Sequence, residues 1–274
     1  MADDWEEDAT RRAKAAQIDT TVPNAARVAD YLYGGQNNFQ ADRKAAQSLA
    51  VAAPVIADIA PAVLGFQQRV LRFLVAEAGI RQILDIGTGL PLVGNTHEVA
   101  QSLAPECRIA YVDSDPMVLA HARALMKSAP EGAVGYVDAD VRDSAAIIAG
   151  ALETLDFSQP VAILLLFTLA YVEDPEAAAV VPSLMAALPS GSYAAIYHLA
   201  SDLGPALEEA VRQWNTMMPA QPLTLRPAAR VAGLAAGLDP VPPGLVPVTD
   251  WRPAANDPGF EHVIPVHAIV ARKP

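Results

Sequence analysis

Three aspartates follow short apolar segments, at intervals that would suit a single binding site. Asp85 ends the run "ILD", Asp113 ends "IAYVD", and Asp140 lies in "YVDADVRD". A carboxylate accepts hydrogen bonds from hydroxyl and amino groups. If the three apolar segments are parallel strands, their carboxyl ends lie along one edge of a sheet. We therefore expect the three acids to bind different parts of one polar ligand.

A glycine turn follows the first of these acids. In "DIGTGL", Gly87 and Gly89 flank Thr88 directly after Asp85. Glycine permits positive φ and lets a ligand approach the backbone closely. A dinucleotide fingerprint needs a third glycine where Leu92 stands, and a phosphate-binding loop needs a Gly-Lys-Ser/Thr sequence that this turn lacks. The pattern favours a nucleoside cofactor without phosphates over a simple strand-to-helix connection.

Together these signals fit S-adenosylmethionine (SAM), with the methionine beside the glycine turn. We expect Asp113 to accept both ribose hydroxyls and Asp140 to accept the adenine amino group. Asp138 and Asp143 compete with Asp140, whereas Asp115 before a proline suits a helix N-cap. The predicted cofactor-binding residues are Asp85, Gly87, Thr88, Gly89, Leu90, Asn95, His97, Asp113, Ser114, Asp140 and Val141, joined by Arg27, Tyr31 and Gly34 from the N-terminal region.

The elements that must position these residues follow a regular alternation from residue 81 onward. Apolar strand segments alternate with amphipathic helices, which predicts an α/β, doubly wound, Rossmann-like sheet that is mostly parallel. Right-handed crossovers place the carboxyl ends of its strands on one edge. Two short strands around the loop "AANDPG" predict an antiparallel final strand, typical of class I methyltransferases. We expect a mobile charged tail at 1–20, an N-terminal helical cover at 21–78 and the SAM-binding core at 79–274.

The segment "DYLYGGQNNF" breaks the helical pattern of the N-terminal region. Adjacent glycines followed by amides are typical of a loop that can bind a polar ligand. We hypothesise that Arg27, Tyr31, Gly34, Asn37 and Asn38 fold over the cofactor as a lid, with Arg27 at the methionine carboxylate. The alternative is a turn between two helices, with Arg27 in a surface salt bridge.

Few residues are candidates for acceptor chemistry. Methyl transfer from a sulfonium mainly requires alignment, and a base is needed only for a hydroxyl or a protonated amine. His198, at the end of the predicted fifth strand, is the leading catalytic candidate, and a structural histidine is the alternative. Tyr171 is the second catalytic candidate, and Glu173 could also line the acceptor pocket. We expect structural roles for His121, His262 and His267.

Composition excludes several classes of function. The net charge is −12 and we find no run of Lys and Arg, which argues against nucleic acid as a partner. The longest apolar run, at 161–172, is too short to span a membrane, and the N-terminus lacks a signal-peptide core. The single cysteine, Cys107, suits a reducing cytoplasm, and no HxxxH or HExxH pattern predicts a metal site.

Longer motifs point to a family. "ARVADYLYGGQNNFQADRKAA", the stretch from "GIRQILDIGTGLPLVGNTHEVAQ" to "DSDPMVLAHARALM", and "DWRP" resemble a bacterial family of SAM-dependent methyltransferases formerly catalogued as a domain of unknown function. The resemblance implies a class I fold with an N-terminal helical cover, SAM as cofactor and S-adenosylhomocysteine (SAH) as product. Leu64 and Gly65 stand near the place where the family usually has Asn-Arg, and Ala170 replaces a histidine usual after the fourth strand.

The resulting prediction is a SAM-dependent methyltransferase of secondary metabolism that acts on a small molecule by in-line SN2 transfer. One alternative is a cyclase or aminocarboxypropyl transferase that uses SAM and releases methylthioadenosine. Another is a SAM-binding sensor without turnover, an alternative raised by Ala170. An NAD-type oxidoreductase is disfavoured by Leu92. The sequence predicts no oligomeric state.

Overall fold

The computed structural model describes residues 19–92, 94–255, 257 and 259–274. Most of the expected 1–20 tail therefore lies outside the described residues. In the described part, eight strands form one sheet in the order β3-β2-β1-β4-β5-β8-β6, and β7 also pairs with β8. The strands are β1 (Gln82–Ile86), β2 (Arg108–Asp113), β3 (Ala133–Asp138), β4 (Ala162–Leu166), β5 (Tyr193–Leu199), β6 (Asp239–Pro240), β7 (Val246–Pro247) and β8 (Val266–Arg272).

The sheet has the predicted mixed direction. Strands β1 to β5 run parallel to one another, and β8 runs antiparallel to β5, with Ile196 opposite Ile269. Because β1 lies between β2 and β4, the strand order reverses there, which is where ligands bind in sheets of this kind. The predicted Rossmann-like fold of the class I type, with an antiparallel final strand, is confirmed.

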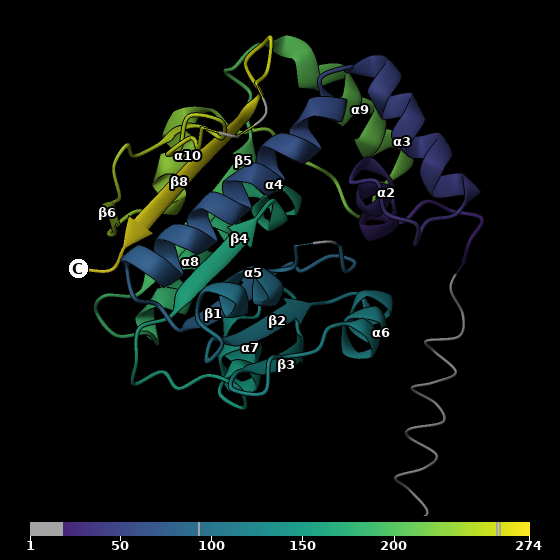
Figure 1. Cartoon of the computed structure of the whole chain (residues 1–274). Coiled ribbons are helices and arrows are strands. Elements are labelled where there is room, and N and C mark those ends of the chain that lie inside the picture. Colours follow the sequence, from purple (N-terminus) through teal and green to yellow (C-terminus); the bar gives the residue numbers. More distant parts are fainter. Residues whose placement is uncertain (1–18, 93, 256, 258) are drawn as a thin grey trace, which may run out of the picture.

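Helices cover both faces of the sheet. Alternate strand residues face opposite sides, so Ile83 and Ile109 pack in one core with Phe66 of α4, whereas Leu84 and Ala110 pack in another with Ile147 of α7. Figure 1 shows α4 lying across one face. The helices of the sheet layers are α4 (Ile56–Arg72), continued by the π-helix η1 (Phe73–Glu77), α5 (Thr96–Leu103), α6 (Pro116–Leu125), α7 (Ser144–Ala151), α8 (Asp174–Ala186) and α10 (Ala228–Leu234).

A second group of helices gathers beyond the carboxyl ends of the parallel strands. Figure 1 shows α2, α3 and α9 together at that end of the molecule. The helices α2, α3 and α9 span Ala25–Leu32, Gln40–Ala52 and Glu208–Met217. The 3-10 turn η2 (Thr168–Tyr171) follows β4, and the 3-10 turn η3 (Pro205–Leu207) precedes α9. The interruption expected at "YGGQNNF" is real, because α2 ends before Gly34, whose φ is +79°. The proposed division at residue 78 stays a prediction.

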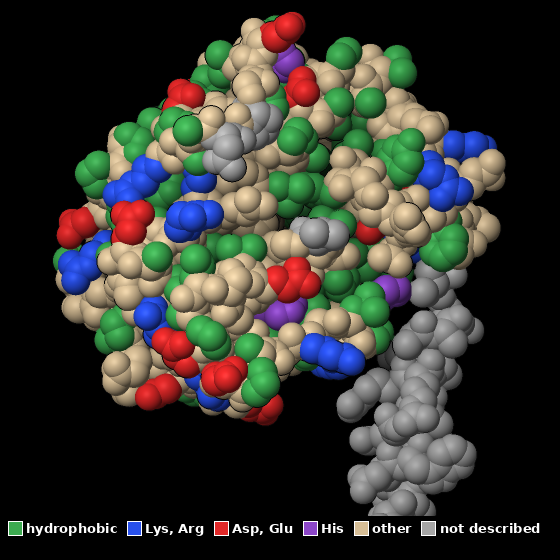
Figure 2. Space-filling model, viewed as in Figure 1, with side chains coloured by type: hydrophobic (Ala, Val, Ile, Leu, Met, Phe, Trp, Pro, Cys, Tyr) green, Lys and Arg blue, Asp and Glu red, His purple; other side chains and the backbone are tan. Residues whose placement is uncertain are grey.

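Surface features add two findings. Figure 2 shows Lys and Arg side chains interspersed with Asp and Glu over the face in view, with hydrophobic side chains gathered in a hollow near its centre. Among the described residues, no single helix is both long and apolar enough to cross a membrane, although α3 and α4 with η1 meet that test as a pair bent by 101°.

Candidate active site

A cavity of about 470 Å³ opens between the carboxyl ends of the strands and the helices beyond them. One half is formed by the ends of β1, β2 and β3 and the loops that follow them. The other half is formed by α2, α9 and the ends of β4 and β5. Ten of the predicted site residues line it: Asp85, Gly87, Thr88, Gly89, Leu90, Asp113, Ser114, Asp140, Val141 and Tyr171.

The glycine turn is held by backbone and side-chain contacts. Gly87 and Gly89 have φ of +78° and +66°, in the left-handed region that favours glycine. A Cβ on Gly87 would come within 2.0 Å of Thr168 Oγ1, which donates a hydrogen bond to the carbonyl of Ile86 at 2.6 Å. No atom lies within 4 Å of a Cβ position on Gly89. The backbone at Gly89 is therefore open to a ligand.

Two carboxylates flank this turn, the buried Asp85 and the half-buried Asp113. Asp85 accepts a hydrogen bond of 2.6 Å from Thr96 Oγ1, and burial raises the pKa of Asp85 to about 6. The two oxygens of Asp113 accept from the backbone N–H groups of Gly89 and Asp115, at 3.0 and 2.9 Å. Burial also raises the pKa of Asp113. Each oxygen keeps a lone pair, so both carboxylates can accept further hydrogen bonds from a ligand.

The carboxylate of Asp140, after the third strand, is less available to a ligand than the sequence analysis predicted. Asp140 lines the cavity, unlike Asp138 and Asp143, but Arg142 holds both of its oxygens at 2.8 and 2.9 Å. That guanidinium lowers the pKa of Asp140. Asp143 instead caps α7 through the N–H of Ala146. A ligand amino group at Asp140 would therefore share the carboxylate with Arg142.

The loop after the glycine turn departs from the prediction. Asn95 and Glu98 form the expected capping box of α5, and the Asn95 amide oxygen accepts from the N–H of Leu92 at 3.1 Å. The His97 ring is buried behind the turn, with Nδ1 2.9 Å from the hydroxyl of Tyr111. Neither Asn95 nor His97 lines the cavity, so both shape the cofactor loop from outside it.

The cover lines the cavity with a face other than the predicted one. Arg27 is buried, pairs with Asp42 at 2.8 Å and donates to backbone carbonyls of the segment before α2, and so does not reach the cavity. The Tyr31 hydroxyl accepts from Gln47 instead, and Gly34 lies in the turn after the helix. The lining residues of α2 are Ala25, Ala26, Val28, Ala29, Asp30 and Leu32, with Tyr33 directly after it.

His198 is not in the cavity, so the geometry does not support its predicted catalytic role. Its ring is fully buried: Nδ1 lies 2.8 Å from the carbonyl of Leu199, and Nε2 lies 2.5 Å from the guanidinium of Arg226. Burial and the neighbouring cation lower the pKa of His198 to about 4. Both ring nitrogens are occupied within the fold, which makes this histidine structural.

Aromatic side chains that the sequence analysis missed form the second half of the cavity. The Tyr33 and Tyr197 hydroxyls are 3.4 Å apart and join the cover to β5. Phe167 packs against Tyr171 and Tyr197, with ring centroids 5.4 and 6.3 Å apart, and the Tyr171 ring lies 6.2 Å from Trp214. Phe167 has a φ of +82°, a strained conformation that is common at functional sites.

The hydroxyls of this aromatic half stay protonated at neutral pH. Burial raises the pKa of Tyr33, Tyr171 and Tyr197, and the nearby Asp113 adds to the rise at Tyr171. They can therefore donate hydrogen bonds but are poor bases. No histidine or lysine occurs among the described lining residues, and no group of three His, Cys, Asp or Glu in the described chain is arranged to hold a metal ion.

Comparisons with known proteins agree with this geometry. Residues 11–274 match a family described as S-adenosyl methyltransferase. A DUF574 family protein from Streptomyces avermitilis is 38% identical, with a TM-score of 0.89, over 94% of this chain and 100% of its own. A putative methyltransferase from Thermobifida fusca is 36% identical, with a TM-score of 0.84, over 93% of this chain and 96% of its own.

More distant structures share the fold alone. The plantazolicin methyltransferase BpumL is 12% identical with a TM-score of 0.54, over 91% of this chain and 96% of its own. A search of curated proteins gave no significant match. The family match covers nearly the whole sequence, and the sequence-based resemblance is confirmed. The chain therefore belongs to the S-adenosyl methyltransferase family, and SAM is its cofactor.

Proposed function

We propose that the protein transfers the methyl group of SAM to a small-molecule acceptor by in-line displacement. The observation that carries this proposal is the two-part cavity: carboxylates and an open glycine turn in one half adjoin an aromatic pocket in the other. Aromatic walls with a few polar groups are typical of small-molecule sites. When bound, SAM supplies a methyl group; the acceptor lone pair forms the new bond to carbon, and the electron pair of the broken C–S bond stays on sulfur, giving SAH.

The residues of the polar half have separate roles in this proposal. Asp113 accepts the two ribose hydroxyls, as expected of an acid at the end of the second strand. Asp85 accepts from the ammonium group of the methionine part, which would relieve the cost of its own burial. The backbone at Gly89 and the loop at Asp140 and Val141 contact the remaining parts of the nucleoside. Their shared cavity supports these roles.

The residues of the aromatic half orient the acceptor and exclude water. Tyr171 and its aromatic neighbours restrict the acceptor to a plane, which supports the alignment that displacement requires. Because its hydroxyl stays protonated, Tyr171 donates a hydrogen bond to the acceptor instead of removing a proton. The proposed chemistry thus depends on alignment, and His198 has no part in it.

Binding of SAH to an Asp113→Asn variant tests the cofactor half. The amide removes the charge that strengthens two hydrogen bonds, each of which contributes about 1.5–3 kcal/mol. We expect SAH to bind roughly 100-fold more weakly in isothermal titration calorimetry. Asp143→Asn is the matched control, because it changes the same charge at the cap of α7, outside the cavity, and should leave the affinity unchanged.

Product analysis tests the reaction itself. Incubation with SAM and fractionated metabolite extract should produce SAH in an acceptor-dependent manner. Methylthioadenosine as the product would replace the proposal with aminocarboxypropyl or cyclase chemistry. Tight SAH binding with no product in any fraction would favour a sensor, and a well-folded protein that binds no SAH would contradict the proposal altogether.

A further inference from the structure

A side-chain hydrogen bond joins the N-terminal cover to the cofactor loops. Nδ2 of Asn24, directly before α2, donates to Oδ2 of Asp115, directly before α6, at 2.9 Å and across 91 positions of sequence. Among the described residues, no other recorded hydrogen bond joins the part of the cover at 19–55 to the loops after β1, β2 and β3. This contact is therefore the polar tie between the cover and the cofactor half of the cavity.

The cover holds its end of this bond in a defined orientation. The backbone N–H of Asn24 donates to the buried Asp42 at 2.9 Å, and Oδ1 of Asn24 accepts from the N–H of Arg27 at 3.1 Å. A backbone N–H can only donate, so the amide oxygen of Asn24 must face Arg27. The amide nitrogen, a donor, is thereby directed at the carboxylate of Asp115.

The other end of the bond belongs to the proposed ribose site. Oδ1 of Asp115 accepts from the N–H of Met117 at 2.8 Å and caps α6, and the N–H of Asp115 donates to Asp113 at 2.9 Å. Asp115 also lines the cavity. Two consecutive hydrogen bonds, from Asn24 to Asp115 and from Asp115 to Asp113, therefore connect the cover with the carboxylate proposed for the ribose hydroxyls.

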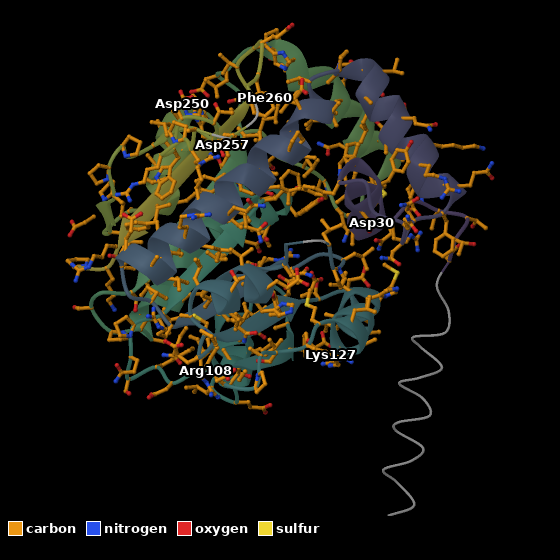
Figure 3. The ribbon with its side chains drawn as sticks, viewed as in Figure 1. Asp30, Arg108, Lys127, Asp250, Asp257 and Phe260 are labelled. Atoms are coloured by element: carbon orange, nitrogen blue, oxygen red, sulfur yellow. The ribbon has the colours of Figure 1, made fainter. Side chains whose placement is uncertain are left out.

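Apolar packing beside this bond brings the same parts of the molecule together. Ala26 of α2 packs against Leu90, Met117 and Val118. Leu90 directly follows the glycine turn, and the other two lie in the first turn of α6. Ala26 and Leu90 also line the cavity. Figure 3, viewed as in Figure 1, shows side chains filling the space between α2, marked by Asp30, and α6. The start of α2 thus rests on the loops that would hold the cofactor.

We propose that Asn24 is a positioning residue, which holds the cover against the cofactor loops and keeps Asp113 directed at the ribose. This inference rests on the cofactor site of the proposed function and adds a residue outside the cavity, because Asn24 acts through Asp115 and is not among the described lining residues. When the bond breaks, α2 can move away from α6, and the bound nucleoside can leave through the opening. The bond therefore prolongs the time for which SAM or SAH stays bound.

An exchange of the two side chains tests the proposal in the full-length protein. Asn24→Asp keeps an oxygen that caps α2, but it brings two carboxylates together. Asp115→Asn keeps an oxygen that caps α6, but it brings two NH₂ groups together. The double variant restores the hydrogen bond with donor and acceptor exchanged, and it has the same net charge as the unaltered protein.

The dissociation rate of SAH, measured by surface plasmon resonance, is the quantity that a positioning role changes. We expect Asn24→Asp and Asp115→Asn each to release SAH at least about 5-fold faster than the unaltered protein, because each loses a charge-assisted hydrogen bond. The double variant should return to within about 2-fold of the original rate. Damage to two separate helix caps would instead accumulate in the double variant.

Two further variants separate this role from general stability. Asn24→Ser retains an oxygen that can cap α2, but its side chain is shorter, so the donor no longer reaches Asp115, and we expect SAH release about 5-fold faster. Ser48→Ala is the matched control, because it removes an exposed hydrogen bond between the cover and Gln213 of α9, outside the cavity. Its SAH dissociation rate should stay within about 2-fold of the original. Urea unfolding of each variant checks that the chain is folded in the assay.

Three results would overturn the inference: SAH release within about 2-fold of the original rate in both Asn24 variants, equal acceleration in Ser48→Ala and Asn24→Ser, or a double variant as fast as either single variant. Binding of SAH to the unaltered protein is measured first. Absence of that binding would defeat the proposed function, whereas SAH binding with unchanged release in the Asn24 variants would defeat the positioning role alone.

Discussion

The two halves of the cavity are built in different ways. The polar half uses acids and glycines that lie within a few residues of their strand ends, such as Asp85 with Gly87, and Asp113 with the N–H of Asp115. The aromatic half collects Tyr33, Tyr171 and Tyr197 from separate parts of the chain. The hydrogen bonds of Asp85 and Asp113 are 2.6–3.0 Å long and join residues at most 24 positions apart. The one hydrogen bond recorded between Tyr33 and Tyr197 spans 164 residues and is 3.4 Å long.

This difference indicates which half can diverge most easily. A loop that binds one cofactor through its backbone depends on the backbone geometry. A side chain added to Gly87, for example, would collide with Thr168. A wall of aromatic side chains from several elements can change one residue at a time without altering the backbone. We infer that the polar half is the constant part of the site and the aromatic half determines the acceptor.

The largest expected effect tests the boundary of the aromatic half. Arg226 is 2% exposed and donates to Asp174 and to the carbonyls of Leu169 and Val172 at 2.6–2.7 Å. Arg226→Met would leave these groups unpaired, and we expect the free energy of unfolding to fall by about 3 kcal/mol in urea titrations. If Arg226 and its partners are purely structural, the SAH affinity of the variant, measured below its unfolding transition, should stay within about 2-fold of that of the unaltered protein.

The neighbouring Arg230 offers a matched control. It approaches the same Asp174 at 4.0 Å, but its side chain is 70% exposed. Arg230→Met should therefore change the free energy of unfolding by less than about 0.5 kcal/mol. If Arg226→Met instead had normal stability but bound ligands much more weakly, Arg226 and the neighbouring His198 would have a role in the functional site.

The sequence predicted the elements better than the direction of their side chains. It identified the strand that contains His198 near its end, but successive strand residues face opposite sides. Tyr197 therefore reaches the cavity, whereas His198 points into the other core beside Arg226. The neighbours of this strand decide which of the two residues faces the ligand, and they are distant in sequence.

The N-terminal cover shows the same type of error. The predicted lid residues Arg27 and Tyr31 of α2 and Gly34 after it do not line the cavity, whereas Asp30 of α2 and Tyr33 directly after it do. One residue of offset rotates a helix position by about 100°. By contrast, Asp85, Asp113 and the glycine turn do line the cavity, because strand ends and turns orient them.

The next effect concerns pH and belongs to the polar half alone. The pKa of Asp85 is about 6 in the folded protein, above the ordinary value of 3.8. Between these values the folded state binds more protons than the unfolded state, so this group lowers stability as pH rises from about 4 to about 6. Because water can enter the cavity beside it, we expect a loss on the order of 2 kcal/mol.

A comparison of Asp85→Asn with the unaltered protein isolates the contribution of Asp85 titration to the free energy of unfolding. The amide oxygen can still accept from Thr96, so the local contact is preserved while the titration is removed. The difference in the free energy of unfolding between the two proteins should grow in favour of the variant from pH 4 to pH 6 and then level off. A difference that stays constant over this range would contradict the raised pKa.

The smallest expected effect measures how firmly the aromatic half is closed. The Tyr33 and Tyr197 hydroxyls are 3.4 Å apart, longer than the usual 2.7–2.8 Å for such a bond. A double-mutant cycle with Tyr33→Phe and Tyr197→Phe should therefore give a coupling energy below about 0.5 kcal/mol in chemical unfolding. We expect a bond this weak to be replaced readily by a hydrogen bond to an acceptor.

The same cycle repeated with ligands decides what that weak coupling means. Whichever tyrosine donates, the other keeps a hydroxyl hydrogen that no described group accepts. If an acceptor uses these hydroxyls, each single variant should weaken its binding by about 5-fold while SAH affinity stays constant. A coupling above about 1.5 kcal/mol in the free protein would mean that the two tyrosines form a fixed structural latch. In that case the aromatic half would be as rigid as the polar one, and the contrast between the halves would lie in their chemistry alone.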